Sequence, residues 1–338
     1  MRTPVSRVGN KTALLGIICP KFPLTYKKFV DVFGGSGSVL LGKPEISSFE
    51  VYNDLDRNLV NLFRCMKHRT MALIRELGFC NLNARDDFRV ITKFFQHETF
   101  DDQFMEEEMQ LTSIMLSEPQ ASELWEMRKR IIMDYDVRRA AMFLKSLRTS
   151  YASTGKSYAA QPFDMRKLFR LIQEMEDRLA TVVIENQDFE TVIRHFDSPT
   201  TFFYGDPPYY LTEDMYDEVF GWKDHVRLRD LLKTIKGYFL LSYNDCPEIR
   251  ELYKEFRIYA FSRPHSMAQR YSAGKEYHEL LIGNYDLFER EKSLPKQLTM
   301  LDQSGNLLDK YDTFDYERVL QESIQPCRID GIPSFLRS

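Results

Sequence analysis

The stretch KKFVDVFGGSGSVLL, residues 27–41, contains the pattern that decides the fold. Residues 27–33 are an apolar run bounded by glycine, which predicts a buried strand, and the following SVLLGKP predicts a short helix. Between the two, Gly34, Gly35 and Gly37 let the backbone pass close to a ligand. Taken alone, the loop is equally typical of a tight strand-to-helix turn that binds nothing.

Strands and helices alternate along much of the remaining chain. Further strands are predicted at 47–54, at 181–189, in the segments PTTFFYGD and GYFLLSYND, and at 277–285. Helices are predicted over 56–67, 123–135 and 137–148, and in the segments DMRKLFRLIQEMEDRLA, KDHVRLRDLLKTI and PEIRELYKEF. This alternation indicates a mostly parallel α/β sheet covered on both faces. The strand signal fades over 68–162, so this segment is predicted to be a second domain threaded into the first.

Composition places the chain among soluble globular proteins. Its 338 residues are 43% hydrophobic and 28% charged, which suits about two domains. No run of ~18 apolar residues and no signal-peptide pattern is found, so we expect no membrane span. The five scattered cysteines never form a CxxC pair, and the six histidines show no ligand spacing. We therefore expect reduced thiols in the cytoplasm and no metal site.

Charge is distributed unevenly along the chain. The net charge is −4, yet residues 128–170 hold eleven lysines and arginines against three aspartates. Residues 98–108 hold six acidic residues. A basic segment of this kind predicts either a face that binds a polyanion or a solvated helix surface.

The position of Asp54 narrows the ligand class. In open α/β sheets, ligands bind outside the carboxyl ends of the strands. Asp54 ends the second predicted strand, 19 residues after Gly35, where a carboxylate can accept hydrogen bonds from both ribose hydroxyls of a nucleoside. The chain has neither GxGxxG nor a phosphate loop here. These features favour an adenosine-containing ligand other than NAD or ATP.

A second unusual loop follows another predicted strand, in FFYGDPPYY, residues 202–210. Pro207 and Pro208 lack a backbone N–H and fix φ, so the strand must end before them. The result is a stiff corner that carries the carboxylate of Asp206, exposed carbonyls and two tyrosine rings. A capping aspartate in a proline turn is the alternative interpretation.

These motifs resemble the Dam-like class of DNA adenine methyltransferases. The segments that carry the resemblance are DVFGGSGSVLL, YNDLD, DPPYY, LLSYND and ELLIGNY, in this order. RVGNKTALLGII is similar to the opening motif of the family, with Gly9-Asn10-Lys11 where two glycines usually precede the lysine. The resemblance covers 1–67 and 163–286, and it implies a mostly parallel, seven-stranded Rossmann-like methyltransferase sheet.

The resemblance also implies the domain organisation. Residues 1–67 and 163–286 would form the catalytic domain that binds S-adenosylmethionine. The segment 68–162 stands where the family has its mainly helical DNA-recognition domain, although little matches there residue by residue. The C-terminal extension 287–338 lies beyond the resemblance, and we expect it to serve self-association, as in a homodimer, or a partner protein.

The implied activity is site-specific methylation of an adenine that is flipped out of double-stranded DNA, as in restriction-modification systems. Asp206 and the carbonyl of Pro207 would each accept one N–H of the exocyclic amine, which turns its lone pair toward the methyl group. Pro208 would keep these acceptors fixed, and Tyr209 would stack on the base. This chemistry requires neither a metal nor a general base.

Cofactor contacts follow from the same resemblance. The residues expected around S-adenosylmethionine are Gly9, Lys11, Phe33, Gly35, Gly37, Asp54, Asp188, Phe189 and Asp206. Asp54 would contact the ribose, and Asp188 and Phe189 the adenine of the cofactor; simple core packing is the alternative for Phe189. The floor of the pocket would be shaped by Ser242, Asn244 and Asp245, of which the last two are equally suited to cap the helix that begins at Pro247.

DNA contacts are predicted from charge. The candidates for phosphate binding are Arg138, Arg139, Lys145, Arg148 and Lys156 in the basic segment, and Arg263, Arg270 and Lys275 in the loop 262–277 between the last two strands. Each is equally interpretable as a solvated surface charge. Three rival functions remain open: an RNA adenine methyltransferase, a small-molecule amine methyltransferase, and a catalytically silent DNA-binding regulator.

Overall fold

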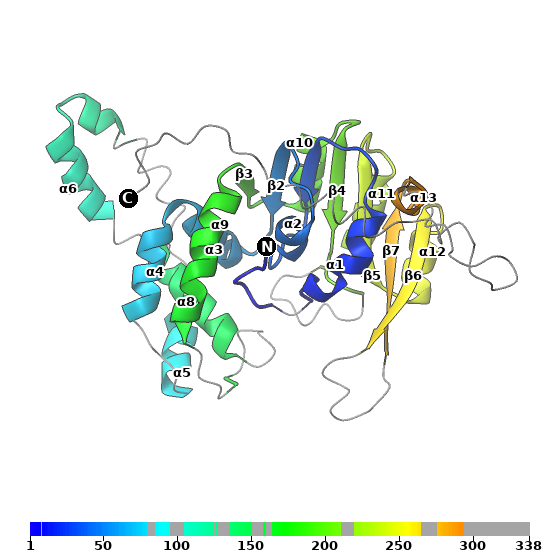
Figure 1. Ribbon diagram of the computed structural model, residues 1–338, viewed down its shortest axis with the longest axis horizontal. Helices are drawn as coiled ribbons and strands as arrows, with labels where there is room; N and C mark the ends of the chain where they lie inside the picture. Colours follow the sequence, from blue (N-terminus) through cyan, green and yellow to red (C-terminus); the bar gives the residue numbers. More distant parts are fainter. Residues whose placement is uncertain are drawn as a thin grey trace, which may run out of the picture. The chain divides into compact units, whose positions relative to one another are not determined.

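A seven-stranded mixed sheet forms the centre of the computed structural model (Figure 1). The structure describes residues 1–7, 9–79, 85–94, 105–124, 126, 136–150, 158–159, 164–210, 220–264 and 276–293. The strands are β1 Lys28–Asp31, β2 Phe49–Asn53, β3 Val182–Glu185, β4 Thr201–Gly205, β5 Tyr238–Asn244, β6 Arg257–Pro264 and β7 Glu276–Gly283. Their order across the sheet is β3-β2-β1-β4-β5-β7-β6.

Only β7 runs against its neighbours. The pairs β2–β3, β1–β2, β1–β4 and β4–β5 are parallel, whereas β7 pairs antiparallel with β5 on one side and β6 on the other. The prediction of a mostly parallel α/β sheet is therefore confirmed, with this last strand as the exception. Because β1 and β4 are neighbours that connect in opposite directions across the sheet, their carboxyl ends mark the switch point where a ligand is expected.

Alternating residues of each strand pack on opposite faces of the sheet. Phe29, Phe202 and Leu240 belong to one hydrophobic cluster, while the next residue of each of these strands belongs to a second. The helices of the first face are α1 Leu15–Ile18, α2 Ser38–Gly42, α3 Arg57–His68 and α9 Phe169–Leu179. Those of the second are α10 Phe189–Phe196, α11 Trp222–Leu232 and α12 Pro247–Leu252. Both faces of the central sheet are thus covered.

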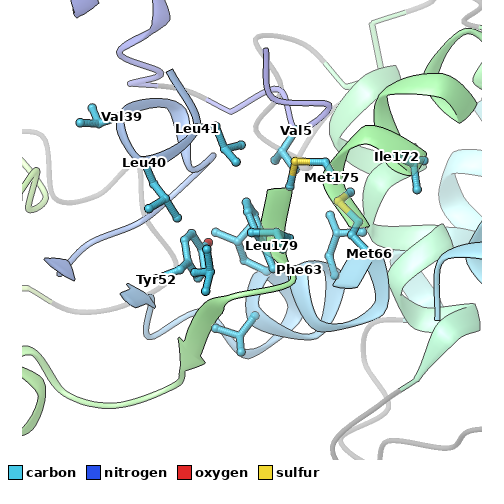
Figure 2. Close-up of a cluster of buried hydrophobic side chains, with 14 of the residues drawn as sticks. Val5, Val39, Leu40, Leu41, Tyr52, Phe63, Met66, Ile172, Met175 and Leu179 are labelled. Atoms are coloured by element: carbon cyan, nitrogen blue, oxygen red, sulfur yellow. The ribbon is translucent and has the colours of Figure 1, made fainter. Parts of the chain in front are cut away.

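The first cluster joins the sheet to α3 and α9 (Figure 2). The rings of Tyr52 and Phe63 stack with centroids 4.1 Å apart and an interplanar angle of 16°. Met66 of α3 and Met175 of α9 lie beside them, and all four side chains are fully buried. Burial of each such side chain contributes about 1.5–3 kcal/mol, so this cluster fixes β2, and with it the turn after β1, on a rigid base.

The described part of the predicted insert is helical. It contains α4 Thr70–Phe79, α5 Arg85–Phe94, α6 Met105–Met115 and α8 Val137–Thr149. Helix α8 packs on α3, α4 and α5, and its Leu144 and Leu147 belong to the same cluster as α3. The Asn61 side chain exchanges two hydrogen bonds of 2.8 Å with the backbone of Asp136, just before α8. Residues 1–293 form one compact unit, and the division at 67/68 into two domains stays a prediction.

The remaining elements are short or differ from their predicted bounds. These are η1 Thr12–Leu14, η2 Cys19–Lys21, η4 Met165–Leu168 and α13 Glu289–Ser293. The helix predicted to begin at Asp164 opens as the 3₁₀ turn η4, which the Asp164 side chain caps. The strand predicted over 181–189 ends at Glu185, because Asp188 caps α10 and Phe189 opens it. The helix predicted at 123–135 and the C-terminal extension beyond Ser293 lie outside the described residues.

Candidate active site

The turn after β1 is built on glycine for two separate reasons. Gly35 and Gly37 adopt φ of 52° and 69°, in the left-handed region that side chains rarely tolerate. At Gly34, a Cβ would lie 2.3 Å from the Tyr52 ring. The Tyr52 hydroxyl then donates to the Gly35 carbonyl at 2.7 Å, so the turn is clamped onto β2. The backbone amides of this loop therefore have fixed positions at the edge of the sheet.

Asp54 ties this turn to the end of β2. Its Oδ2 accepts from Gly35 N at 2.7 Å and its Oδ1 from Asp56 N at 2.9 Å. Burial raises the pKa of the Asp54 carboxyl above 3.8, an effect that Arg7 opposes. Arg7 itself binds Asp56 at 2.8 Å. Each Asp54 oxygen retains acceptor capacity, so the carboxylate can both shape the turn and bind a hydroxyl group.

The corner after β4 brings a lysine and a carboxylate together. Lys11 Nζ lies 2.8 Å from Asp206 Oδ2 and donates to the Gly9 carbonyl at 3.1 Å. The same ammonium lies over the Tyr209 ring, 4.8 Å from its centroid. Lys11 comes from the N-terminal segment and Asp206 from the end of β4, so the fold unites two motifs that are far apart in sequence. A charge-assisted bond of this kind fixes the orientation of the Asp206 carboxylate.

Asp31 lies buried behind this pair, at the end of β1. Its pKa is raised well above 3.8, first by burial and then by the negative charges of Asp206 and Asp54. Asp31, Asp54 and Asp206 thus concentrate acidic groups at the carboxyl ends of β1, β2 and β4. Such an arrangement favours a ligand that carries positive charge and hydroxyl groups.

Aromatic rings and an arginine form the other side of the site. The rings of Phe33, Phe189 and Phe220 lie with centroids 5.7 to 5.8 Å apart. Arg227 covers the Phe189 ring at 4.2 Å and donates to both carboxylate oxygens of Asp188, at 3.2 and 2.8 Å. This wall offers flat apolar surface bordered by a carboxylate, which is the chemistry that a purine ring requires.

A cavity of about 420 Å³ lies between the glycine turn, the corner after β4 and the aromatic wall. Its lining includes Gly9, Phe33, Gly35, Asp54, Asp188, Phe189, Asp206 and Pro208 from the predicted site. The other predicted residues do not line it. Lys11 pairs with Asp206 and lies over the Tyr209 ring, Gly37 stands at the N-cap of α2, and Pro207 is buried. The volume lies in the range of small-molecule sites.

Arg7, Phe220 and Arg227 line the cavity but were not predicted as site residues. Arg7 begins the segment RVGNKTALLGII, so the sequence could have suggested it. Phe220 and Arg227 come from a region without any motif. They reach the cavity because α11 packs against α10 on the second face of the sheet. Only the tertiary structure could identify them.

The cations predicted to bind DNA occupy different environments. Arg138 is exposed and lies 3.7 Å from Glu76. Arg139 and Lys145 are only 6% and 1% exposed, and Arg139 Nε donates to Asn58 Oδ1 at 2.5 Å. Arg148 donates to the Pro4 carbonyl.

Burial of Arg139 and Lys145 corrects the expectation that they contact phosphates at the surface. Because α8 packs on three other helices, part of its basic face points into protein. The predicted contacts Lys156, Arg270 and Lys275, and the side chain of Arg263, lie outside the described residues.

Within the described residues, no group of three or more His, Cys, Asp or Glu side chains is arranged to hold a metal ion. None of the described helices combines the length and the apolar character needed to cross a membrane.

Most of the chain matches a known protein family. Residues 8–267 match the family model described as D12 class N6 adenine-specific DNA methyltransferase. The matched range includes both the glycine turn and the DPPYY corner. It also spans the whole of the predicted insert 68–162.

Proposed function

The chain belongs to the D12 class of N6 adenine-specific DNA methyltransferases, and from this premise we propose that it transfers a methyl group from S-adenosylmethionine to the exocyclic amine of a specific adenine in double-stranded DNA. The observation that carries the proposal is the Lys11–Asp206 pair at the edge of the cavity, with the two atoms 2.8 Å apart. A carboxylate oriented in this way supports the proposal, because the target amine needs such an acceptor.

The residues that line the cavity fit S-adenosylmethionine. Of the acidic groups, Asp54 and Asp206 line the cavity and suit its ammonium, sulfonium and ribose hydroxyls, while Asp31 is buried close by. The Phe33, Phe189 and Phe220 wall suits its adenine. Asp188 borders this wall, although Arg227 already binds both of its oxygens. When bound, S-adenosylmethionine supplies an electrophilic methyl group. We propose that Gly9, Lys11, Phe33, Gly35, Gly37, Asp54, Asp188, Phe189 and Asp206 hold it.

Asp206 and Pro207 carry out the central task of the mechanism. The adenine amine is a weak nucleophile because its lone pair is delocalised into the ring. The Asp206 carboxylate and the Pro207 carbonyl each accept one of its hydrogens, which disfavours that delocalisation and points the lone pair toward the methyl group. Pro207 and Pro208 restrict the backbone, so both acceptors are held in place before the base arrives.

The target adenine has to leave the duplex to reach this corner, at a cost of a few kcal/mol. Stacking on the Tyr209 ring would offset roughly 1–3 kcal/mol of this cost. In the structure, Lys11 lies over that ring. We infer that Lys11 shifts along the ring as the base enters, while its bond to Asp206 keeps the carboxylate oriented.

The remaining assignments concern DNA and the cell. We propose that 68–162 reads the target sequence, that exposed Arg138 contacts phosphate, and that Lys156, Arg263, Arg270 and Lys275 are further phosphate contacts. A DNA substrate implies action in the cytoplasm, and a single methylated motif would suit a restriction-modification system. The extension 287–338 is proposed to serve self-association or a partner protein.

The experiment is methylation of plasmid DNA, from a host without adenine methylation, by the purified protein with radiolabelled S-adenosylmethionine. Modified adenines are then mapped by single-molecule sequencing, with RNA of the same sequence as a parallel substrate. We expect one short DNA motif to be methylated. The Asp206→Ala variant should lose at least about 10³-fold in transfer while it binds cofactor, because an acceptor in the transition state is removed. Turnover of that variant at the wild-type rate would refute the mechanism, and transfer to RNA alone would refute the substrate.

A further inference from the structure

A buried carboxylate on β7 contacts the catalytic corner from behind. Glu279 is 2% exposed, and its Oε2 lies 3.1 Å from the Tyr209 hydroxyl. It begins the segment ELLIGNY, and it lies beyond residues 8–267, the range that matches the family model. No role in cofactor binding or in the mechanism above has been assigned to it.

The strand register delivers Glu279 to this position. In the antiparallel pair of β5 and β7, Glu279 is opposite Asn244 and Leu281 is opposite Ser242. Side chains two residues apart on a strand share a face, so Glu279 and Ser242 lie on the same side of the sheet as diagonal neighbours. The Tyr209 hydroxyl meets both, since it lies 3.1 Å from Ser242 Oγ as well.

The hydrogen-bond directions at Tyr209 follow from donor chemistry. Burial, and after it the negative charges of Asp206 and Glu279, raise the pKa of Tyr209 well above 10, so its hydroxyl remains protonated. An ionised carboxylate can only accept, so the single Tyr209 proton is donated to Glu279. Ser242 then donates to the Tyr209 oxygen. The Tyr209 hydroxyl thus donates one hydrogen bond, to Glu279, and accepts one, from Ser242.

The Tyr209 ring is held on its faces as well. Tyr243 stacks near it with centroids 6.2 Å apart and an interplanar angle of 29°. Lys11 lies 4.8 Å from its centroid. Together with these neighbours, the hydrogen bond to Glu279 restricts how the ring can tilt. Its orientation decides how a base that stacks on it presents its amine.

We propose that Glu279 is a positioning residue for the methyl transfer, which acts through the Tyr209 hydroxyl to hold the stacking ring in register with Asp206. This inference rests on the proposed function, because it concerns the base that Asp206 receives. Misplacement of a reacting group by about 1 Å costs on the order of 10²-fold in rate. Glu279 should therefore affect the rate of transfer and leave cofactor affinity unchanged.

The test compares Glu279→Ala, Glu279→Gln, Tyr209→Phe and the double variant Glu279→Ala/Tyr209→Phe. Single-turnover methyl transfer to plasmid DNA gives the rate, and calorimetry gives the dissociation constant of S-adenosylmethionine. We expect Glu279→Ala to lose about 30- to 100-fold in rate, with a cofactor dissociation constant within about twofold of wild type. Glu279→Gln, whose amide oxygen still accepts the Tyr209 proton, should recover about tenfold of that loss.

The double variant decides whether Glu279 acts through Tyr209. If it does, removal of both groups costs no more than the larger single loss, because the same contact is removed twice. Tyr285→Phe is the matched control: its hydroxyl donates to the Lys21 carbonyl at 2.7 Å, away from Asp206. Combined with Glu279→Ala, this control should give independent, multiplicative effects on rate.

Three results would overturn the proposal. The first is Glu279→Ala with a wild-type rate. The second is multiplicative losses in the Glu279/Tyr209 double variant, and the third is a Glu279→Gln variant no faster than Glu279→Ala. Thermal melting identifies a variant that fails to fold. If Glu279→Ala does not fold, the single-turnover rates of Glu279→Gln and Tyr209→Phe test the proposal instead. A wild-type protein that methylates no DNA would instead refute the proposed function, so the two failures are distinguishable.

Discussion

Two buried lysine–carboxylate pairs serve opposite purposes in this molecule. In the core, Lys43 Nζ lies 2.5 Å from Glu50 Oε1, and Arg178 Nη1 lies 2.6 Å from the other carboxylate oxygen. At the cavity, Lys11 binds Asp206 at 2.8 Å. The first carboxylate is saturated by two cations, whereas the second is surrounded by further acids.

The pKa shifts show what this difference means. Burial alone would raise the pKa of Glu50, but the bonds from Arg178 and Lys43 outweigh it and the pKa is lowered. At the site, the pKa values of Asp31 and Asp54 are raised, with burial as the largest cause. The scaffold therefore holds its buried carboxylate ionised between two cations, whereas the buried acids Asp31 and Asp54 at the site ionise less readily.

Glu50→Ala should produce the largest change in stability. It would leave Lys43 and Arg178 buried without their shared carboxylate, which costs about 3–5 kcal/mol in the free energy of unfolding. Urea unfolding measures the loss. Glu174→Ala is the control, because Glu174 pairs at the surface with the exposed Arg170, and it should cost less than about 1 kcal/mol. Equal losses in the free energy of unfolding would show that the buried pairs of Glu50 contribute no more than the exposed pair of Glu174.

Lys11→Met should produce the corresponding change in catalysis. Without its ammonium the Asp206 carboxylate is no longer fixed, and we expect transfer to fall about 10²-fold, equivalent to roughly 2.7 kcal/mol in the activation free energy. Single-turnover rates on plasmid DNA measure the effect. Lys11→Arg, which keeps a cation, should recover part of the rate. A Lys11→Met variant that keeps its rate but unfolds as readily as Glu50→Ala would show that both pairs are structural.

Asp31→Asn should stabilise the ligand-free protein while it weakens the binding of S-adenosylmethionine. The substitution removes a buried acid that faces Asp206 and Asp54, so we expect a gain of about 1 kcal/mol and a rise of a few degrees in Tm. Thermal melts without cofactor test the stability of the ligand-free protein, and melts with cofactor test the binding of S-adenosylmethionine. A lower Tm in the absence of cofactor would mean that the Asp31 carboxyl belongs to the scaffold.

The pH dependence of stability should show two opposite slopes. A raised folded pKa means that Asp31 and Asp54 favour the folded state at low pH, and that this contribution is lost as pH rises through the folded pKa values. A lowered pKa means that Glu50 contributes above its ordinary value of 4.5 and that this contribution is lost as pH falls below it.

Thermal melts between pH 4 and 8 measure both slopes. Mild acidification should stabilise the wild type, through Asp31, by on the order of 1 kcal/mol. The Asp31→Asn variant should lack this gain. Parallel curves for the two proteins would contradict the raised pKa of Asp31.

The sequence predicted those features that depend on local pattern. The glycine turn, the DPPYY corner and most strands were found because glycine, proline and apolar runs restrict the backbone directly. The acid at Asp54 was found because it ends a strand. Asp188 and Phe189 were predicted at a strand end but open α10, because the cap made by Asp188 begins a helix that an apolar run alone does not reveal.

The missed features depend on contacts between distant elements. Phe220 and Arg227 reach the cavity only because α11 packs where it does, and Glu279 only because β7 lies between β5 and β6. The cations of α8 were predicted to face solvent. Charge in a sequence does not report burial: Arg139 and Lys145 are both buried, and Arg139 Nε donates to Asn58 Oδ1.

The position of β7 has a consequence for how the protein is made. Among the described residues, the strand that is translated last, β7, is also an inner strand of the sheet, since it lies between β5 and β6. Until residues 276–283 have been translated, β5 and β6 have no partner between them and present unpaired edges. Helix α13, which follows β7, is then linked to the N-terminal part of the chain by the ion pair between Glu291 and Lys21. We therefore expect a chain released before residue 276 to be inactive and prone to aggregate.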